Sequence, residues 1–137
     1  MTDEEAYHEL CGYTLTHGGA AFIHQHVVDA YAAQSATERS KPIGVTFALV
    51  GLCLHVEKGF SGRQVQRAHM KMGRRKRAWP ALALPRERGA VTARSVLEAP
   101  EGPERDQAID DWCASVWAAF IPNRPTVVAL LNEYEIA

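Results

Sequence analysis

The longest apolar run of the chain, Ile43 to Val56, is the feature that most constrains its fold. A membrane-spanning helix needs about 20 apolar residues, so this run is too short to cross a bilayer. It follows Pro42, a residue that suits the first turn of a helix. The run therefore predicts a central helix that is buried in a globular core. With 137 residues, the chain fits one domain, residues 1–137, that can bury such a core.

Helical spacing of apolar residues extends over much of the remaining chain, and strand-like alternation is nearly absent. The stretch from Trp79 to Gly102 is rich in proline and glycine, which predicts an irregular excursion with one short helix starting at Thr92. Pro103 then opens an amphipathic helix with a continuous apolar stripe that ends at Phe120. We predict an all-α, single-domain bundle of about five or six helices, with an irregular segment near residues 79–102.

Charge and cysteine content indicate the cellular compartment and the classes of partner to expect. The formal charge of −1 gives no bulk attraction to nucleic acid or to an anionic membrane. Cys11, Cys53 and Cys113 are odd in number and far apart, which favours free thiols in a reducing compartment. The acidic start from Thr2 to Glu5 lacks the basic region of a signal peptide. We therefore expect a cytoplasmic protein with no membrane partner.

Histidines placed near buried helix faces suggest a metal centre. His24, His55 and His69 each lie on or beside the apolar face of a different predicted helix. Gly44 and Gly51 share the stripe that His55 continues, which predicts a close helix–helix approach there. Three imidazoles and an open position can hold Zn, Ni, Fe or Mn and activate a water molecule. The alternative is that each histidine is a hydrogen-bonded core residue, and no HExxH spacing favours the metal.

The helix from Ile23 to Gln34 also offers acid–base chemistry without a metal. His26 and Asp29 stand three residues apart on a side away from its predicted buried face, so the carboxylate can orient the imidazole. They are the candidate catalytic residues. The alternative is an ordinary exposed pair within one helix. The predicted buried face itself comprises Ala20, Ile23, Val27, Ala30, Tyr31 and Gln34.

No acidic residue lies between Glu57 and Glu87, whereas basic residues accumulate there. Four of them share one helix face, which is a local footprint for phosphate or another anion. No helix-turn-helix spacing or ladder of aromatic residues supports nucleic acid as the partner. There are two alternatives to anion binding: the cations form an ordinary solvated face, or the acidic segment Glu98 to Asp111 neutralises them within the fold or across a dimer. The four residues are Arg63, Arg67, Lys71 and Arg74.

Several segments of the chain resemble an uncharacterised, mainly bacterial family classed as a domain of unknown function. The mark of that family is a His-x4-Asp-Ala-Tyr-x-x-Gln helix followed by a Gly-Leu-Cys helix, which begin here at His24 and Gly51. The resemblance implies a small helical domain and transfers no activity. Many relatives have histidine where this chain has Ser35, and some carry an N-terminal Cys-x-x-Cys segment, so these departures weaken a metal role. The resembling segments are Tyr7–Cys11, Ile23–Gln34, Gly51–Cys53, His55–Phe60 and Trp112–Trp117.

Two functional hypotheses follow, and the sequence leaves open whether the protein is an enzyme. The first is a divalent-metal-binding bundle with hydrolase or transferase chemistry, in which the three histidines are ligands. The second is a non-enzymatic interaction or scaffold domain that binds an anionic partner through residues 63–77. In either case we expect a homodimer formed through the tryptophan-bearing or C-terminal helices.

Overall fold

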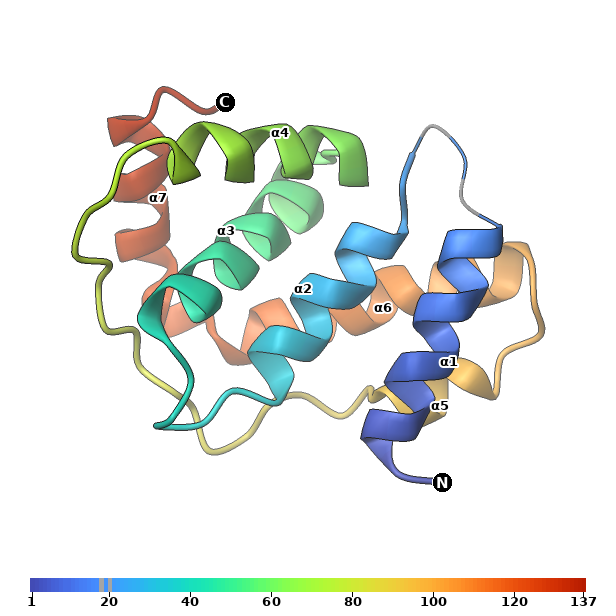
Figure 1. Cartoon of the computed structure of the whole chain (residues 1–137). Coiled ribbons are helices and arrows are strands. Elements are labelled where there is room, and N and C mark those ends of the chain that lie inside the picture. The colour runs from blue at the N-terminus through green and yellow to red at the C-terminus, as the bar shows by residue number, and fades with distance from the viewer. Residues whose placement is uncertain (18, 20) are drawn as a thin grey trace.

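The computed structural model describes residues 1–17, 19 and 21–137 of the chain. This part forms seven α-helices and one short 3-10 helix without any strand, which confirms the all-α prediction (Figure 1). The number of α-helices exceeds the predicted five or six because the short helix after Thr92 is a separate helix, α5 (Ala93–Leu97). In chain order the elements are α1 (Asp3–Thr16), α2 (His24–Gln34), α3 (Pro42–Lys58), α4 (Gly62–Gly73), α5 (Ala93–Leu97), α6 (Pro103–Ala119), η1 (Ile121–Asn123) and α7 (Arg124–Glu133).

Local sequence signals set most of the helix starts. Thr2, Ser61 and Thr92 each form a capping box with the residue three positions later, which satisfies backbone N–H groups that have no partner inside the helix. Proline occupies the first turn of α3, α6 and α7, where its missing N–H costs no helical hydrogen bond. At the end of α3, Gly59 takes the left-handed conformation that closes a helix, with a φ of 69°.

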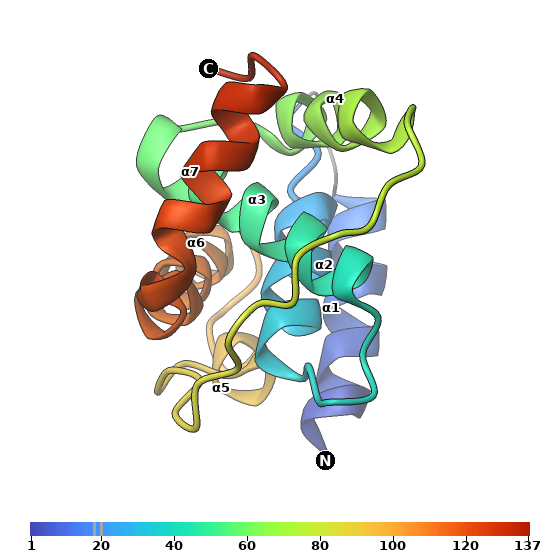
Figure 2. The ribbon, with the colours of Figure 1, turned by 90° about the vertical axis from the view of Figure 1, so that its left-hand side faces the viewer.

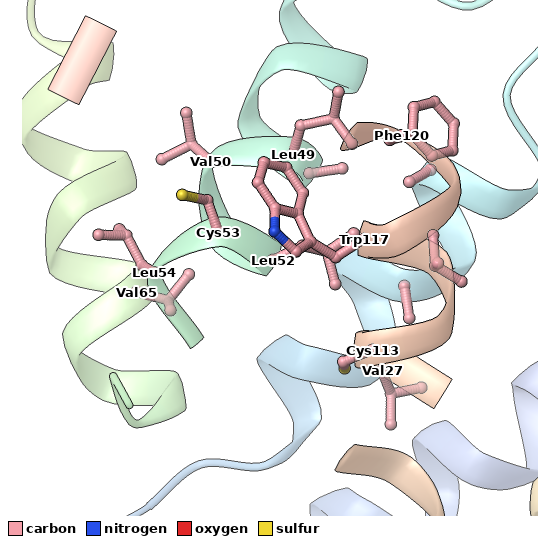
Figure 3. Packing of buried hydrophobic residues seen from close by; sticks show 14 of the residues in the cluster. Val27, Leu49, Val50, Leu52, Cys53, Leu54, Val65, Cys113, Trp117 and Phe120 are labelled. Carbon is pink, nitrogen blue, oxygen red and sulfur yellow. The ribbon is translucent and has the colours of Figure 1, made fainter. Parts of the chain in front are cut away.

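Helix α3 lies at the centre of the bundle, as the apolar run predicts. It contacts α2, α4, α6 and α7, and both views show it enclosed by them (Figures 1 and 2). Leu49 and Leu52 of α3 lie beside Trp117 of α6 in the core (Figure 3). None of the helices in the described part of the chain has the length and apolarity that crossing a bilayer requires.

The tryptophans of α6 belong to this core and not to an exposed interface. Trp112 and Trp117 are both buried within the single chain. The indole Nε1 of Trp112 donates to Gln34 Oε1 at 2.9 Å, and that of Trp117 donates to Glu57 Oε2 at 2.8 Å. Their indoles are thus unavailable as anchors of the expected homodimer, because they already fill the interior. The homodimer itself stays a prediction.

The irregular segment before α5 is fixed by side chains that bind backbone groups. It runs from the end of α4 to α5 along the outside of the bundle (Figure 2). Arg88 Nη1 donates to the carbonyl oxygens of Ala33, Gln34 and Ala36, at 3.0 to 3.3 Å. In return, Gln34 Nε2 donates to the carbonyl oxygens of Arg88 and Val91. Arg88 therefore supplies a cation and donors to the C-terminal end of α2, where helix carbonyls lack partners.

We predict that Arg88→Ala lowers the free energy of unfolding by about 2 to 3 kcal/mol, because several carbonyls lose a charged donor. Urea unfolding followed by circular dichroism measures this. Arg86→Ala is the control, since Arg86 is exposed two residues earlier and its removal should change stability by less than about 0.5 kcal/mol. Equal losses in the two variants would contradict the anchoring role of Arg88.

Candidate functional site

Helix α2 is enclosed more completely than its sequence indicates, because α1, α3, α4 and α6 all contact it. His26 and Asp29, predicted to face away from the core, are both buried. Tyr31 and Gln34, predicted within the buried face, are partly buried. The predicted orientation was wrong for the first two because a helix between several neighbours has more than one buried side. Ala20, assigned to the same face, lies outside the described residues.

Three ionisable side chains, His26, His55 and Asp110, meet where α2, α3 and α6 contact one another. We call them the histidine cluster. The rings of His26 and His55 are stacked, with centroids 3.5 Å apart and planes within 18° of parallel. His55 Nε2 donates to Asp110 Oδ1 at 2.8 Å, and its Nδ1 donates to the carbonyl oxygen of Phe60 at 2.9 Å. Both partners are acceptors, so both ring nitrogens of His55 carry protons.

The electrostatics of the cluster agree with this assignment. Burial opposes the charge on His55, but the hydrogen bonds to Asp110 and Phe60 outweigh it and raise the pKa of His55 above its ordinary value. The hydrogen bond from His55 lowers the pKa of Asp110. Burial, and secondly the charge of His55, lower the pKa of His26 to about 3. The cluster therefore contains a neutral imidazole stacked on an imidazolium that is paired with a carboxylate.

This arrangement does not provide a free general base. Neither nitrogen of His55 is available unless a hydrogen bond breaks. His26 has a pKa several units below the range in which a base is most effective at neutral pH. The stacked rings link α2 to α3, and the bond between His55 and Asp110 links α3 to α6, so the cluster holds three helices together.

Asp29 lies apart from the cluster, inside the contact between α2 and α3. Its Oδ1 accepts from Gln25 Nε2 at 3.0 Å, whereas its Oδ2 has no hydrogen-bond partner among the described residues. A Cβ on Gly51 would lie only 1.9 Å from Oδ2, so the carboxyl group occupies the space that a side chain at Gly51 would fill. Burial raises the pKa of Asp29 well above its usual range. The carboxyl group is accordingly protonated over a wide range of pH.

The predicted pairing of His26 with Asp29 is replaced by these other contacts. In the described part of the chain no hydrogen bond joins the two side chains, since Asp29 binds Gln25 and His26 stacks on His55. A catalytic role for His26 or Asp29 stays a prediction.

The three candidate metal ligands have different surroundings. His24 Nδ1 lies 3.1 Å from Thr14 Oγ1 on α1, and His69 Nε2 donates to the carbonyl oxygen of Phe47 on α3 at 2.7 Å. His55 belongs to the histidine cluster. Across residues 1–17, 19 and 21–137, no three His, Cys, Asp or Glu side chains are grouped so that they could hold a metal ion. A site for Zn, Ni, Fe or Mn at His24, His55 and His69 therefore stays a prediction, without support from these contacts.

Asp110 is the main member of the cluster that sequence reasoning missed. It stands among the acidic residues outside the apolar stripe of α6, and its side chain is 52% exposed. Its partner His55 is 55 positions away in the chain. No local pattern joins such positions, because only the packing of α3 on α6 brings them together.

A second candidate site lies on the surface of α4. We call Arg63, Arg67, Lys71 and Arg74 the basic face, and all four are exposed. The opposite side of α4 is buried through Val65, Ala68 and Met72, as the spacing predicts. The structure thus confirms that Arg63, Arg67 and Lys71 share the solvent-facing side of α4, and Arg74 follows as its exposed C-cap residue.

Charge at the end of this helix is partly compensated by α7. Arg75 and Arg77 form ion pairs with Glu133, and the ring of Tyr134 lies beneath both guanidinium groups. The segment Glu98 to Asp111, named above as a possible source of neutralisation, does not provide it in this chain. Within the described residues its ion pairs are with His17, His55 and Arg105.

We predict that Asp110→Asn lowers the pKa of His55 and removes a pH-dependent part of the stability. The ion pair needs protonated His55 and ionised Asp110, so it stabilises the fold fully between about pH 4 and pH 6.5, the ordinary pKa values of the two groups. It is lost as the pH rises through the raised pKa of His55, and as the pH falls through the lowered pKa of Asp110.

The expected loss at pH 5.5 is about 0.5 to 1 kcal/mol, because Asp110 is half exposed. NMR titration of the histidine ring and urea unfolding at pH 5.5 and 9 measure the two effects. Asp111→Asn is the matched control, since Asp111 is exposed and, among the described residues, its side chain binds Gln107 of its own helix alone. An unchanged His55 titration in Asp110→Asn would refute the pairing.

We predict that Asp29→Asn changes the pH dependence of stability. The folded pKa of Asp29 is raised, so its contribution is complete below the unfolded pKa of about 3.9 and is lost as the pH rises toward the folded pKa. The amide of the variant cannot ionise. The stability of the variant relative to the wild type should therefore rise by about 1.4 kcal/mol per pH unit above pH 4, until the folded pKa is reached. Urea unfolding at each pH measures the difference, and a difference that stays constant from pH 4 to 8 would show that Asp29 is ionised in the fold.

Comparison with known proteins places this architecture in a family. No curated protein and no solved structure shows significant similarity to the chain. Residues 4–121 match the model of a protein family that is described as "Family of unknown function (DUF5946)". This range extends from α1 to η1. It contains both the histidine cluster and the basic face. The chain belongs to this family of unknown function, DUF5946.

Proposed function

We propose that the domain is a non-enzymatic interaction module that binds an anionic partner through the basic face of α4. The single observation that supports this is the absence of carboxylate partners for Arg63, Arg67, Lys71 and Arg74 among the described residues, on a helix side that faces solvent.

Arginines elsewhere in the chain differ from those of the basic face. Arg124 binds both carboxylate oxygens of Glu57. Arg105 donates to the carbonyl oxygens of Ala99 and Leu97 and pairs with Glu101. These cations hold the fold together. The cations of the basic face have weaker contacts: Arg63 donates to Gln66 and lies over the ring of Phe22, and Lys71 Nζ lies 3.5 Å from the carbonyl oxygen of Glu135. None of the four pairs with a carboxylate among the described residues, so their charges are available to an external anion.

The energetics also favour an external partner. Like charges one helical turn apart destabilise a helix by about 0.2 to 0.5 kcal/mol per pair, and the basic face has such pairs at Arg63–Arg67 and Arg67–Lys71. A bound anion would relieve this repulsion. The buried titratable groups support a binding role over catalysis, because both nitrogens of His55 are engaged and Asp29 has no contact with solvent.

The test uses retention on an anionic matrix, heparin-agarose, at neutral pH. Because the net charge is −1, retention would report a local cationic surface and not the overall charge. We expect the wild type to be retained at low salt and released as salt increases. The combined change Arg67→Glu, Lys71→Glu and Arg74→Glu should abolish retention.

A control with equal charge change is available in Arg39→Glu, Lys41→Glu and Arg86→Glu, three exposed cations away from α4. The control variant should elute from heparin-agarose at a salt concentration at least half of that needed for the wild type. If the control variant loses binding as completely as the α4 variant, or if the wild type is not retained, the proposal fails. Circular dichroism confirms that each variant is folded.

A further inference from the structure

The basic face also carries an exposed apolar side chain. Met70 lies three residues after Arg67 and four before Arg74, so it projects from the same side of α4. It is 62% exposed. Methionine is flexible and polarisable, and it is frequent on surfaces that bind other proteins. The face is therefore a mixed basic and apolar surface.

A hollow of about 270 Å³ adjoins this face, between α4 and the C-terminal residues. Its apolar lining comes from Phe60, Ala68 and Ile136. Its polar lining comes from Arg67, Lys71, Gln64 and one carboxylate, Glu135. The C-terminus lies next to α4 in both views of the ribbon (Figures 1 and 2). Lys71 Nζ lies 3.5 Å from the carbonyl oxygen of Glu135, which ties the C-terminal residues to the helix. The hollow can accept an apolar side chain between two cations.

The spacing of the cations fits a helix. Arg63, Arg67 and Lys71 follow one another at four-residue intervals, which places them about 6 Å apart along the helix axis. Carboxylates at four-residue intervals on a second helix have the same spacing. From the charges, the hollow and Met70, we infer that the anionic partner is an acidic amphipathic helix of another protein. It would place carboxylates against the basic face and an apolar side chain in the hollow.

Two other anionic classes fit less well. Binding of single-stranded nucleic acid relies on exposed aromatic rings, and no aromatic residue is among the large exposed hydrophobic residues of the described chain. Insertion into an anionic membrane requires an exposed apolar helix side. The apolar side of α4 is turned into the core through Val65, Ala68 and Met72. This inference rests on the proposed function and narrows the partner.

The experiment compares purified probes by fluorescence anisotropy and by calorimetry. The main probe is a capped, labelled helical peptide of about 18 residues, roughly 27 Å long, with Glu at four-residue intervals and a flanking row of Leu. Its two control peptides replace Glu by Gln or Leu by Ala. A labelled DNA duplex of similar length is the nucleic-acid probe. The full-length chain is used throughout.

We expect the acidic peptide to bind and both control peptides to bind at least tenfold more weakly. Arg67→Glu with Lys71→Glu should weaken binding at least tenfold, whereas Arg39→Glu with Arg86→Glu should change it less than threefold. Met70→Gln, which keeps the helix propensity but removes the apolar contact, should weaken binding about three- to tenfold. Met70→Leu should leave it unchanged.

The outcomes distinguish this inference from the proposed function. If duplex DNA binds more tightly than the acidic peptide, and Met70→Gln does not change DNA binding, the inference of an acidic helix as the partner is overturned while the proposed function stands. A salt-sensitive dimer in sedimentation that dissociates on charge reversal of α4 would identify a second copy as the partner and also overturn it. If neither probe binds and heparin retention is absent, both proposals fail.

Discussion

The enclosure of α3 is the constraint on which the rest of the structure depends. A helix that is apolar on nearly every side is stable in water only when other helices cover it, and α2, α4, α6 and α7 do so here. The charged and imidazole side chains of α3 lie in its last turn. There His55 reaches Asp110 of α6, and Glu57 binds Arg124 and Trp117. These bonds fix the helices that cover α3.

The two motifs that carry the family resemblance meet inside this arrangement. Asp29 of the first motif occupies the space left by the absent side chain of Gly51 in the second. Gln34, at the end of the first motif, accepts from Trp112 and donates to the segment that contains Arg88. Tyr31 stacks on Tyr7 of α1, with ring centroids 4.0 Å apart. The motif residues thus have packing and hydrogen-bonding tasks that explain their types without requiring catalysis.

Ionisable groups in the interior of the molecule and on the surface of α4 have different surroundings. Inside, ionisable groups are paired, stacked or held neutral: His26 and His55 link α2 to α3, His55 and Asp110 link α3 to α6, and Asp29 binds Gln25 of its own helix. Outside, α4 presents Met70 and cations that have no carboxylate partner among the described residues. Removing charge from the inside is expected to change stability, whereas removing it from α4 is expected to change binding.

The sequence by itself determined the all-α class, the central helix, the start of the short helix at Thr92, and the cationic side of α4. These features depend on spacing and capping within one helix, and such local rules can be read along the chain. The tertiary structure decided the surroundings of His26, Asp29 and Asp110. Their burial and partners depend on how α2, α3, α4 and α6 pack, and no short-range pattern encodes contacts between positions 55 residues apart. For the same reason, His24, His55 and His69, which the sequence predicts as metal ligands, each have a different hydrogen-bond partner in the structure.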